Sequence, residues 1–192
     1  MWKVGIEFAL QFLPPNFSMK RDRLLWGFIE NRPFLRLYHG YGLSLLRMRR
    51  LEEALQVFEN ILSLNPHDNQ GARALVVECN FELNRPEAVL DLCNRFANDG
   101  LEQLVYGRPL ALFQLNRVAE AARAFRRAQK IYPRIAEELT KVTHVRPEGW
   151  REDRITLGGA DQAYAYWKEF SRFWRKTPGA LPFAKGIAKE AR

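Results

Sequence analysis

The chain has 192 residues, with 30 Lys and Arg against 22 Asp and Glu, which gives a formal charge of +8 and a pI near 9.8. Because 47% of the residues are hydrophobic, the chain can form a packed core, and intrinsic disorder is excluded as its main state. Its two cysteines, Cys79 and Cys93, are too few for a disulfide scaffold or a Cys-rich zinc module and indicate a reducing compartment, so we expect a cytoplasmic protein.

Residues 1–33 are predicted to form an N-terminal helical segment. From Trp2 to Phe12 apolar side chains alternate with others as in a β-strand, but no partner strand is evident, so we expect a short packed helix. A second helix is predicted for residues 18–31, with Ser18 as its N-cap. The apolar start lacks a small-residue cleavage site, and no apolar run approaches the roughly 20 residues that span a bilayer. Neither a secretory signal nor membrane insertion is therefore expected.

Two segments of the chain repeat each other. They run from Leu35 to Pro66 and from Glu102 to Pro133, and each closes with a proline. Each also has an Ala followed four residues later by a Phe in its second predicted helix. A weaker copy lies between them, so that three equivalent alanines, Ala54, Ala88 and Ala121, recur after 34 and 33 residues. This period is typical of helix-turn-helix repeats.

The two strong segments resemble tetratricopeptide repeats. The matching residues are Tyr38, Tyr41, Gly42, Leu45, Leu51, Ala54, Phe58, Ile61 and Pro66 in the first, and Leu112, Val118, Ala121, Phe125, Ala128 and Pro133 in the third. The resemblance implies an all-α fold, a right-handed α-solenoid of about three such units over residues 34–133, with flanking helices. Small residues such as Gly42 let two antiparallel helices cross closely. Pro109 breaks this pattern, and we favour a late start of its helix near Arg108 over a bend at the proline.

Residues 134–192 are predicted to form C-terminal helices. A short helix reaches about Val142, a polar loop spans 143–159, an aromatic helix spans 160–176, and a weak basic helix continues to Arg192. A repeat array needs a cap over its last apolar face, so we interpret the aromatic helix as a C-terminal cap, with a partner surface as the alternative. A second resemblance rests on the Asn65-Pro66 helix end, the Ala-Tyr-Ala-Tyr of residues 163–166, Trp174, and the Gly-Ala-Leu of residues 179–181. In these features the repeat and tail are similar to the family of suppressor of tumorigenicity protein 7. That resemblance implies a scaffold or binding role without catalytic residues.

A tetratricopeptide array binds its partners in the concave groove lined by the first helix of each unit. The resemblance places eleven residues there: Arg36, His39, Leu43, Leu46, Arg47, Arg73, Val77, Phe81, Tyr106, Leu110 and Phe113. This lining is mainly apolar with several cations, and it suits a protein or peptide ligand with apolar anchors and some negative charge. His39 and Leu43 stand where the family's carboxylate clamp needs Lys and Asn, which argues against a chaperone-tail receptor.

The excess positive charge lies in the second half of the chain. Residues 97–192 hold eighteen of the 30 basic side chains but only eleven of the 22 acidic ones. Such asymmetry indicates a polyanionic partner, although Arg side chains also coat solvated helix faces. Four cations form a predicted basic patch opposite the core residues of one helix: Arg123, Arg126, Arg127 and Lys130. Nucleic acid is therefore an alternative partner, but no aromatic side chains for base stacking interleave this patch.

Residues that carry catalysis or metal binding are not grouped in this sequence. His39, His67 and His144 lie on separate predicted elements, with no carboxylate or cysteine at ligand spacing. Phosphate-binding loops, dinucleotide fingerprints and nucleophile elbows are also missing from the sequence. We therefore predict a non-enzymatic protein with no cofactor and no metal, whose function is to bind another protein.

Overall fold

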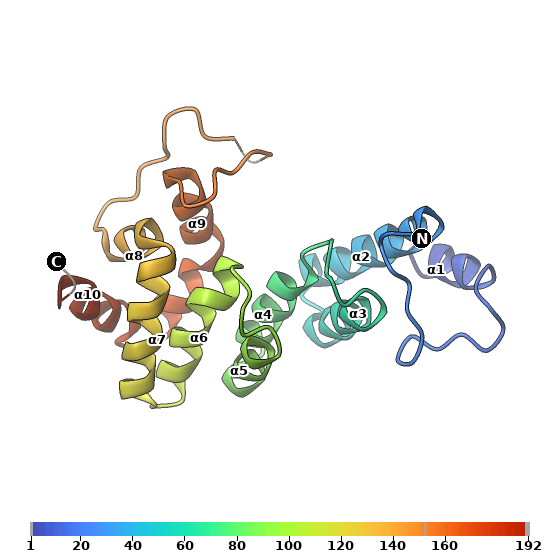
Figure 1. Cartoon of the computed structure of the whole chain (residues 1–192), viewed down its shortest axis with the longest axis horizontal. Helices are drawn as coiled ribbons and strands as arrows, with labels where there is room; N and C mark the ends of the chain where they lie inside the picture. Colours follow the sequence, from blue (N-terminus) through green and yellow to red (C-terminus); the bar gives the residue numbers. More distant parts are fainter. Residues whose placement is uncertain (1, 152, 191–192) are drawn as a thin grey trace. The chain divides into compact units, whose positions relative to one another are not determined.

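The computed structural model describes residues 2–151 and 153–190 (Figure 1). In these ranges the chain forms ten α-helices and one 3-10 helix, with no β-strand. The predicted all-α fold is confirmed, and the packing of consecutive helices agrees with a solenoid of helix-turn-helix units. The chain divides into two compact units, one ending at Asn84 and the other beginning at Arg85. This boundary falls inside the weak middle repeat, and the predicted division into three domains stays a prediction.

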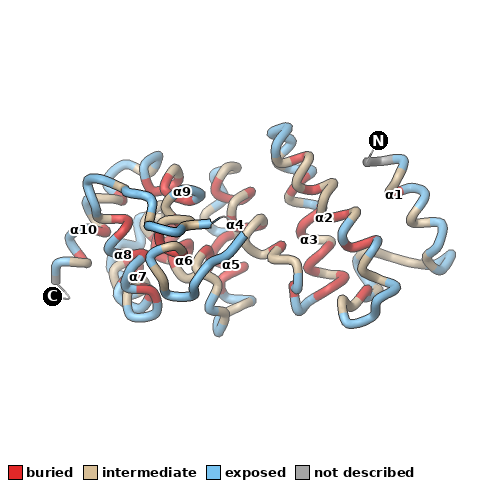
Figure 2. The backbone as a smooth tube through the Cα atoms, turned by 90° about the horizontal axis from the view of Figure 1, so that it is seen from above, coloured by how far each residue is buried: buried red, intermediate tan, exposed pale blue. Residues whose placement is uncertain are grey.

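The first unit contains a short N-terminal helix and three packed helices. Its elements are α1 (Trp2–Leu10), η1 (Ile29–Asn31), α2 (Arg32–Arg47), α3 (Leu51–Leu64) and α4 (Ala72–Glu82). α3 packs against both α2 and α4, and α1 packs against α2. In Figure 2 the buried positions of this unit gather on α2, α3 and α4, whereas α1 is mostly exposed or half-buried.

A close crossing and a tight turn join α2 to α3. A Cβ atom added at Gly42 would lie 2.6 Å from Cε1 of Phe58, so only glycine permits this approach. The turn places Arg49 in the left-handed region at φ +60°, and the Arg50 amide donates to the Leu45 carbonyl at 2.9 Å. This bond closes the C-terminal end of α2 as in a Schellman motif. The predicted role of Gly42 at the crossing is confirmed.

The chain before α2 is less helical than predicted. The short helix expected at the start is present as α1, but the helix predicted for residues 18–31 is wrong, since only η1 forms there. The Ser18 amide donates to the Asp22 carboxylate at 2.6 Å, which makes a local turn. The Leu24 amide donates to the Leu64 carbonyl at the end of α3, at 2.8 Å. A distant backbone partner therefore replaces the helical hydrogen bonds of this segment.

The second unit contains the remaining six helices of the described residues. They are α5 (Pro86–Arg95), α6 (Glu102–Gln114), α7 (Val118–Ile131), α8 (Pro133–Thr140), α9 (Ala160–Lys176) and α10 (Ala180–Glu190). α6 packs against α5, α7 and α9, and α8 packs against α7, α9 and α10. The bounds predicted for the aromatic helix are confirmed by α9. Of the predicted final helix, residues 191–192 lie outside the described residues.

Pro109 lies inside α6, and the expected late start of that helix is wrong. The helix begins at Glu102 and continues through the proline to Gln114. Proline has no amide hydrogen, so the usual helical bond to the Val105 carbonyl cannot form. Tyr106, Pro109 and Leu110 are all buried. Tertiary packing therefore outweighs the cost of an interior proline, which is about 3 kcal/mol.

The aromatic helix α9 is covered on two sides by its own chain. Its buried side carries Tyr166, Phe170, Phe173 and Trp174. The Trp174 ring meets Phe125 of α7 edge-on, with the ring centroids 5.9 Å apart. Two ring pairs join α9 to the loop of residues 141–159: His144 with Trp167, and Trp150 with Tyr164. These contacts account for the wide aromatic circumference of the helix.

Candidate partner-binding surface

One face of α2 carries the first five predicted groove residues. Their spacing of three and four positions places them on the same side of the helix. Arg36 and Arg47 are exposed, whereas His39, Leu43 and Leu46 are half-buried. We call these five residues the α2 stripe. It is an apolar strip with a cation at each end, and it extends roughly 16 Å along the helix axis at 1.5 Å per residue.

His39 lies against the helix pair beneath the α2 stripe. Its ring meets Phe58 of α3 edge-on, with the ring centroids 5.8 Å apart. Its Nε2 atom is buried without a hydrogen-bond partner in the part of the chain that the structure describes. Burial lowers the pKa of His39, and the negative charge of Asp68 opposes this effect only in part. The imidazole is therefore neutral at pH 7 and adds no positive charge to the stripe.

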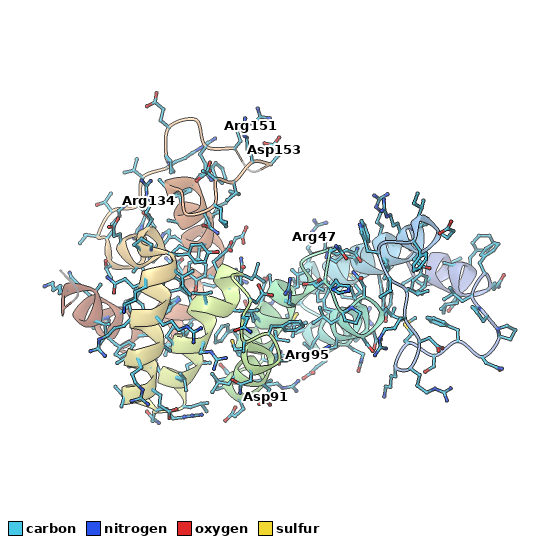
Figure 3. The ribbon with its side chains drawn as sticks, in the orientation of Figure 1. Arg47, Asp91, Arg95, Arg134, Arg151 and Asp153 are labelled. Carbon is cyan, nitrogen blue, oxygen red and sulfur yellow. The ribbon has the colours of Figure 1, made fainter. Side chains whose placement is uncertain are left out.

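The two arginines of the α2 stripe have different surroundings. The Arg36 guanidinium lies over the Trp26 ring at 5.3 Å from its centroid, and Arg32 lies over the same ring at 5.4 Å. Arg47, labelled in Figure 3, is exposed at the C-terminal end of α2 and has no hydrogen-bond or ion-pair partner among the described residues. The sequence analysis did not predict this role of Trp26. The signal that could have indicated it is a tryptophan a few residues before two arginines that share one helix face. Arg47 is therefore the freer cation.

The predicted groove residues of α4 offer little to a ligand. Val77 and Phe81 are buried, with 0% and 5% of their surfaces exposed. The Arg73 Nε atom donates to the Asp68 carboxylate at 2.8 Å, and this carboxylate also accepts the backbone amides of Ala72 and Arg73. Asp68 thus caps the first two amides of α4 from four residues before the helix start, whereas the N-cap position itself is Gly71. These residues stabilise α4 and do not extend the α2 stripe.

In the third repeat, the C-terminal helices cover the corresponding positions. Tyr106 and Leu110 have 0% and 1% of their surfaces exposed. The Tyr106 ring packs against the ring of Tyr166 of α9, with the ring centroids 5.6 Å apart. Phe113 packs against Phe183 of α10, with the ring centroids 4.7 Å apart. Tyr106 and Leu110 are therefore covered within the chain, whereas Phe113 stays half-buried beside its contact with α10.

The predicted basic patch lies on the outer side of α7. The inner side of this helix is buried and consists of Ala121, Phe125 and Ala128. The four cations of the patch are all exposed: Arg123, Arg126, Arg127 and Lys130. The helix is thus divided sharply into a core face and a cationic face. The chemical character of the basic patch therefore differs from that of the mainly apolar α2 stripe.

Metal and membrane sites are not evident in the described ranges, 2–151 and 153–190. No cluster of three or more His, Cys, Asp or Glu side chains there is arranged to hold a metal ion. None of the helices in those ranges combines the length and the apolar character that crossing a membrane requires. Cys79 and Cys93 are free and buried, and burial raises the pKa of their thiols to about 12 and about 11. Neither thiol is an activated nucleophile at neutral pH.

Comparison with known proteins gives one match. Residues 35–68 match the family model of the tetratricopeptide repeat. The matched segment contains nearly all of α2, all of α3 and the capping residue Asp68, and the whole α2 stripe lies within it. Neither the search of curated proteins nor the search of solved structures found a match.

Proposed function

Because this chain is a tetratricopeptide-repeat-containing protein, with the repeat at residues 35–68, we propose that it is a non-enzymatic adaptor that binds a protein or peptide on the α2 stripe. The observation that carries the proposal is the accessibility of this stripe. Its apolar residues Leu43 and Leu46 are only half-buried, although they lie on the helix that lines the groove in this kind of repeat. Leucines left partly open on a helix face are suited to a partner's apolar side chains.

The charges of the α2 stripe define the partner further. Arg36 and Arg47 flank the two leucines, and the neutral His39 lies between them. A ligand that buries one or two apolar side chains on the leucines and carries an acidic side chain near either end complements this arrangement. The separation of the arginines, roughly 16 Å along the helix, corresponds to about three turns of an α-helix or about five residues of extended peptide.

Cross-linking in cell lysate followed by mass spectrometry tests this proposal, since it identifies both the partner and the residues that contact it. The test variant is Leu43→Glu with Leu46→Glu, which places two carboxylates on the apolar strip. Burying an unpaired carboxylate against an apolar side chain is strongly unfavourable, so we expect cross-links from α2 to the partner to be lost. We also expect affinity capture of the same partner to fall at least about tenfold.

A matched control separates loss of binding from added charge. Val145→Glu with Leu157→Glu introduces the same two carboxylates at positions that are 73% and 77% exposed, in the loop of residues 141–159. It should leave capture of the partner unchanged, and circular dichroism should show that all variants keep their helical content. Full retention of the partner by the folded double variant would exclude the α2 stripe as the binding surface.

Nucleic acid is a second candidate partner, favoured by the exposure of all four cations of the basic patch on α7. If these cations contact phosphates, the affinity for a single-stranded oligonucleotide should fall steeply with salt. For four contacts the slope of log affinity against log salt is about −3. A shallow slope, or no effect of reversing the charge of Arg123, Arg126 and Arg127, would exclude this function.

We propose a cytoplasmic location for the protein, and its thiols support this proposal. Two buried cysteines without a disulfide are typical of a protein in a reducing compartment, and the cytoplasm is such a compartment. Fractionation of cells that express the tagged protein checks this placement. Recovery with secreted or organelle proteins would contradict it.

A further inference from the structure

The second unit contains a cavity that the proposed function does not use. Its volume is about 630 Å³, and it lies between the C-terminal end of α5, the loop of residues 96–101, α6 and α7. Figure 1 shows these three helices side by side in this unit. Cavities of roughly 300–1,000 Å³ are the usual size for ligand sites in proteins. The cavity and the α2 stripe share no residue.

The loop on one side of the cavity is held by several hydrogen bonds. The Leu101 amide donates to the Asp99 carboxylate at 2.8 Å, and the Asp99 amide donates to the Phe96 carbonyl at 3.0 Å. The hydroxyl of Tyr132, the residue that follows α7, donates to the Gly100 carbonyl. The cavity wall is therefore formed before any ligand arrives, which reduces the entropy lost on binding.

Three arginines line the cavity, against one carboxylate among its described residues. Arg108 of α6 donates from Nη1 to Oδ1 of Asn94 at 2.9 Å, which holds its guanidinium at the wall. Arg123 and Arg127 lie one turn apart on α7 and make no hydrogen bond or ion pair with any described residue. The carboxylate, Asp99, already accepts the Leu101 amide. The hydrogen bond from Arg117 lowers the pKa of Glu120, and the charge of Arg123, three residues after that carboxyl, adds to this effect, so the charge of Arg123 is partly compensated. The cavity still offers an anion two guanidinium groups that have no ion-pair partner among the described residues.

Most of the remaining wall is apolar, with Phe96 in the loop and small or aliphatic side chains on the helices, whereas Asn98 is polar. It includes Leu104 and Val105 of α6 and Ala124, Ala128 and Ile131 of α7. The two alanines have small side chains and so leave room for a ligand, and Ile131 at the edge of the cavity is 45% exposed. An aliphatic side chain placed here would bury apolar surface on both helices. The site therefore combines an apolar wall with cations at its mouth.

We propose that this cavity binds an acidic peptide segment in which an aliphatic side chain stands next to one or more carboxylates. The aliphatic side chain fills the space beside Ala124 and Ala128, and the carboxylates pair with Arg123 and Arg127. Guanidinium groups bind carboxylates through paired N–H donors, so two of them one turn apart favour adjacent acidic residues. The site is separate from the α2 stripe, and it gives the adaptor a second point of attachment.

The division of the basic patch favours a peptide over nucleic acid. Only Arg123 and Arg127 line the cavity, whereas Arg126 and Lys130 lie outside it on the same helix. A phosphate backbone is bound by charge alone and would draw on all four cations alike. A peptide with an aliphatic anchor in the cavity depends on the two lining arginines. This difference makes the two ligands distinguishable by mutation.

Fluorescence anisotropy on the full chain tests the proposal with two labelled probes. The first is an octapeptide of Asp, Glu and Leu residues, and the second is a single-stranded 12-nucleotide DNA. The test variant is Arg123→Glu with Arg127→Glu, and the matched control is Arg126→Glu with Lys130→Glu, which changes the net charge of the same helix equally. We expect the test variant to weaken peptide binding at least about tenfold and the control to weaken it by less than about threefold.

A second pair of variants tests the apolar wall without changing charge. Ile131→Gln removes an aliphatic side chain from the edge of the cavity, and Val118→Gln makes a comparable change on α7 outside it, at a position that is 49% exposed. We expect the first to weaken peptide binding about three- to tenfold and the second to leave it unchanged.

Three outcomes would overturn the proposal. One is absence of peptide binding, or peptide binding that survives reversal of Arg123 and Arg127 in a folded protein. Another is an equal loss in the two charge-reversed proteins, which would indicate diffuse attraction. The third is tighter binding of the DNA than of the peptide, lost equally in both variants. None of these results depends on Leu43 or Leu46, so failure here is separable from failure of the α2 stripe.

Discussion

The first and third repeats have the same local architecture. Their connecting turns each contain one left-handed residue, Arg49 at φ +60° and Asn116 at φ +57°. Their second helices each have an N-cap Arg that pairs with a Glu three residues later, Arg50 with Glu53 and Arg117 with Glu120. Their crossings each contain an edge-on ring pair, His39 with Phe58 at 5.8 Å and Tyr106 with Phe125 at 5.7 Å. Turn, cap and crossing therefore follow from the repeat itself.

The two repeats differ in what covers the face of the first helix. On α2 the residues His39, Leu43 and Leu46 stay half-buried. On α6 the aligned positions meet α9 and α10, and Gln114 donates to the Thr177 hydroxyl between those helices at 2.9 Å. The same scaffold thus serves as a candidate ligand surface in one place and as an internal docking surface in the other. The chain that follows the repeat decides between these uses.

Trp174→Ala should have the largest effect, because it removes the main aromatic contact of α9 with the third repeat. The side chain is 1% exposed and meets Phe125, so we expect the free energy of unfolding to fall by about 3–5 kcal/mol. Urea denaturation followed by circular dichroism measures this. Trp167→Ala is the control, since that half-buried indole stacks on His144 and should cost about 1–2 kcal/mol. Equal losses in the two variants would contradict the covering role of Trp174.

Gly42→Ala tests the crossing of the first repeat and should have the next largest effect. The new Cβ would lie 2.6 Å from Phe58 Cε1, so the core must shift and stability should fall by about 1–3 kcal/mol. Gly5→Ala is a matched helical control, because its Cβ would meet Leu37 at an ordinary 3.6 Å. That change should be neutral or slightly stabilising in thermal unfolding. An unchanged melting temperature for Gly42→Ala would show that α2 and α3 can separate freely.

Pro109→Ala examines the aligned position in the third repeat, where the expected sign is opposite. The substitution restores an amide that can donate to the Val105 carbonyl, a gain of up to about 3 kcal/mol. It also removes buried ring atoms and increases the conformational entropy of the unfolded chain. Together these two effects lower the free energy of unfolding by about 2 kcal/mol. We therefore expect a net stabilisation of about 1 kcal/mol in urea denaturation. A destabilised variant would mean that the proline ring is essential to the packing of α6.

The features that could be predicted from the sequence depend on neighbours close in the chain. The helices α2, α3 and α7 follow from apolar periodicity, and the cationic face of α7 follows from the same spacing. The helix predicted for residues 18–31 failed because the Leu24 amide bonds to Leu64, a residue far along the chain. The late start predicted for α6 failed because burial of Pro109 outweighs its helix-breaking tendency.

The candidate sites depend on contacts that no local pattern contains. Nothing around Tyr106 or Phe113 indicates that α9 and α10 cover them, since Tyr166 and Phe183 lie many residues away. The cavity likewise needs the loop of residues 96–101, which is fixed by the hydroxyl of Tyr132, the residue between α7 and α8. Aligned sequence positions therefore locate a face, but tertiary packing determines whether that face is open.

His39 should make the first repeat sensitive to acid, in contrast to the third. Burial holds its pKa below the usual 6.5, so between the folded and unfolded pKa values the unfolded chain binds more protons. The stability that the neutral imidazole contributes is therefore complete above pH 6.5 and is lost as the pH falls towards the folded pKa. We expect the midpoint of urea unfolding to decrease between pH 7.5 and pH 5.5, and a midpoint independent of pH would contradict this role.

His39→Tyr isolates this contribution, because it gives the first repeat the residue that the third has at the aligned position. A tyrosine can keep the edge-on contact with Phe58, as Tyr106 does with Phe125, and its hydroxyl does not titrate in acid. The midpoint of urea unfolding of the variant should therefore decrease less between pH 7.5 and pH 5.5 than that of the wild type, while the two midpoints stay similar at pH 7.5. If wild type and variant show the same decrease, other groups must bind the protons, and burial of His39 does not set the acid sensitivity of the open repeat.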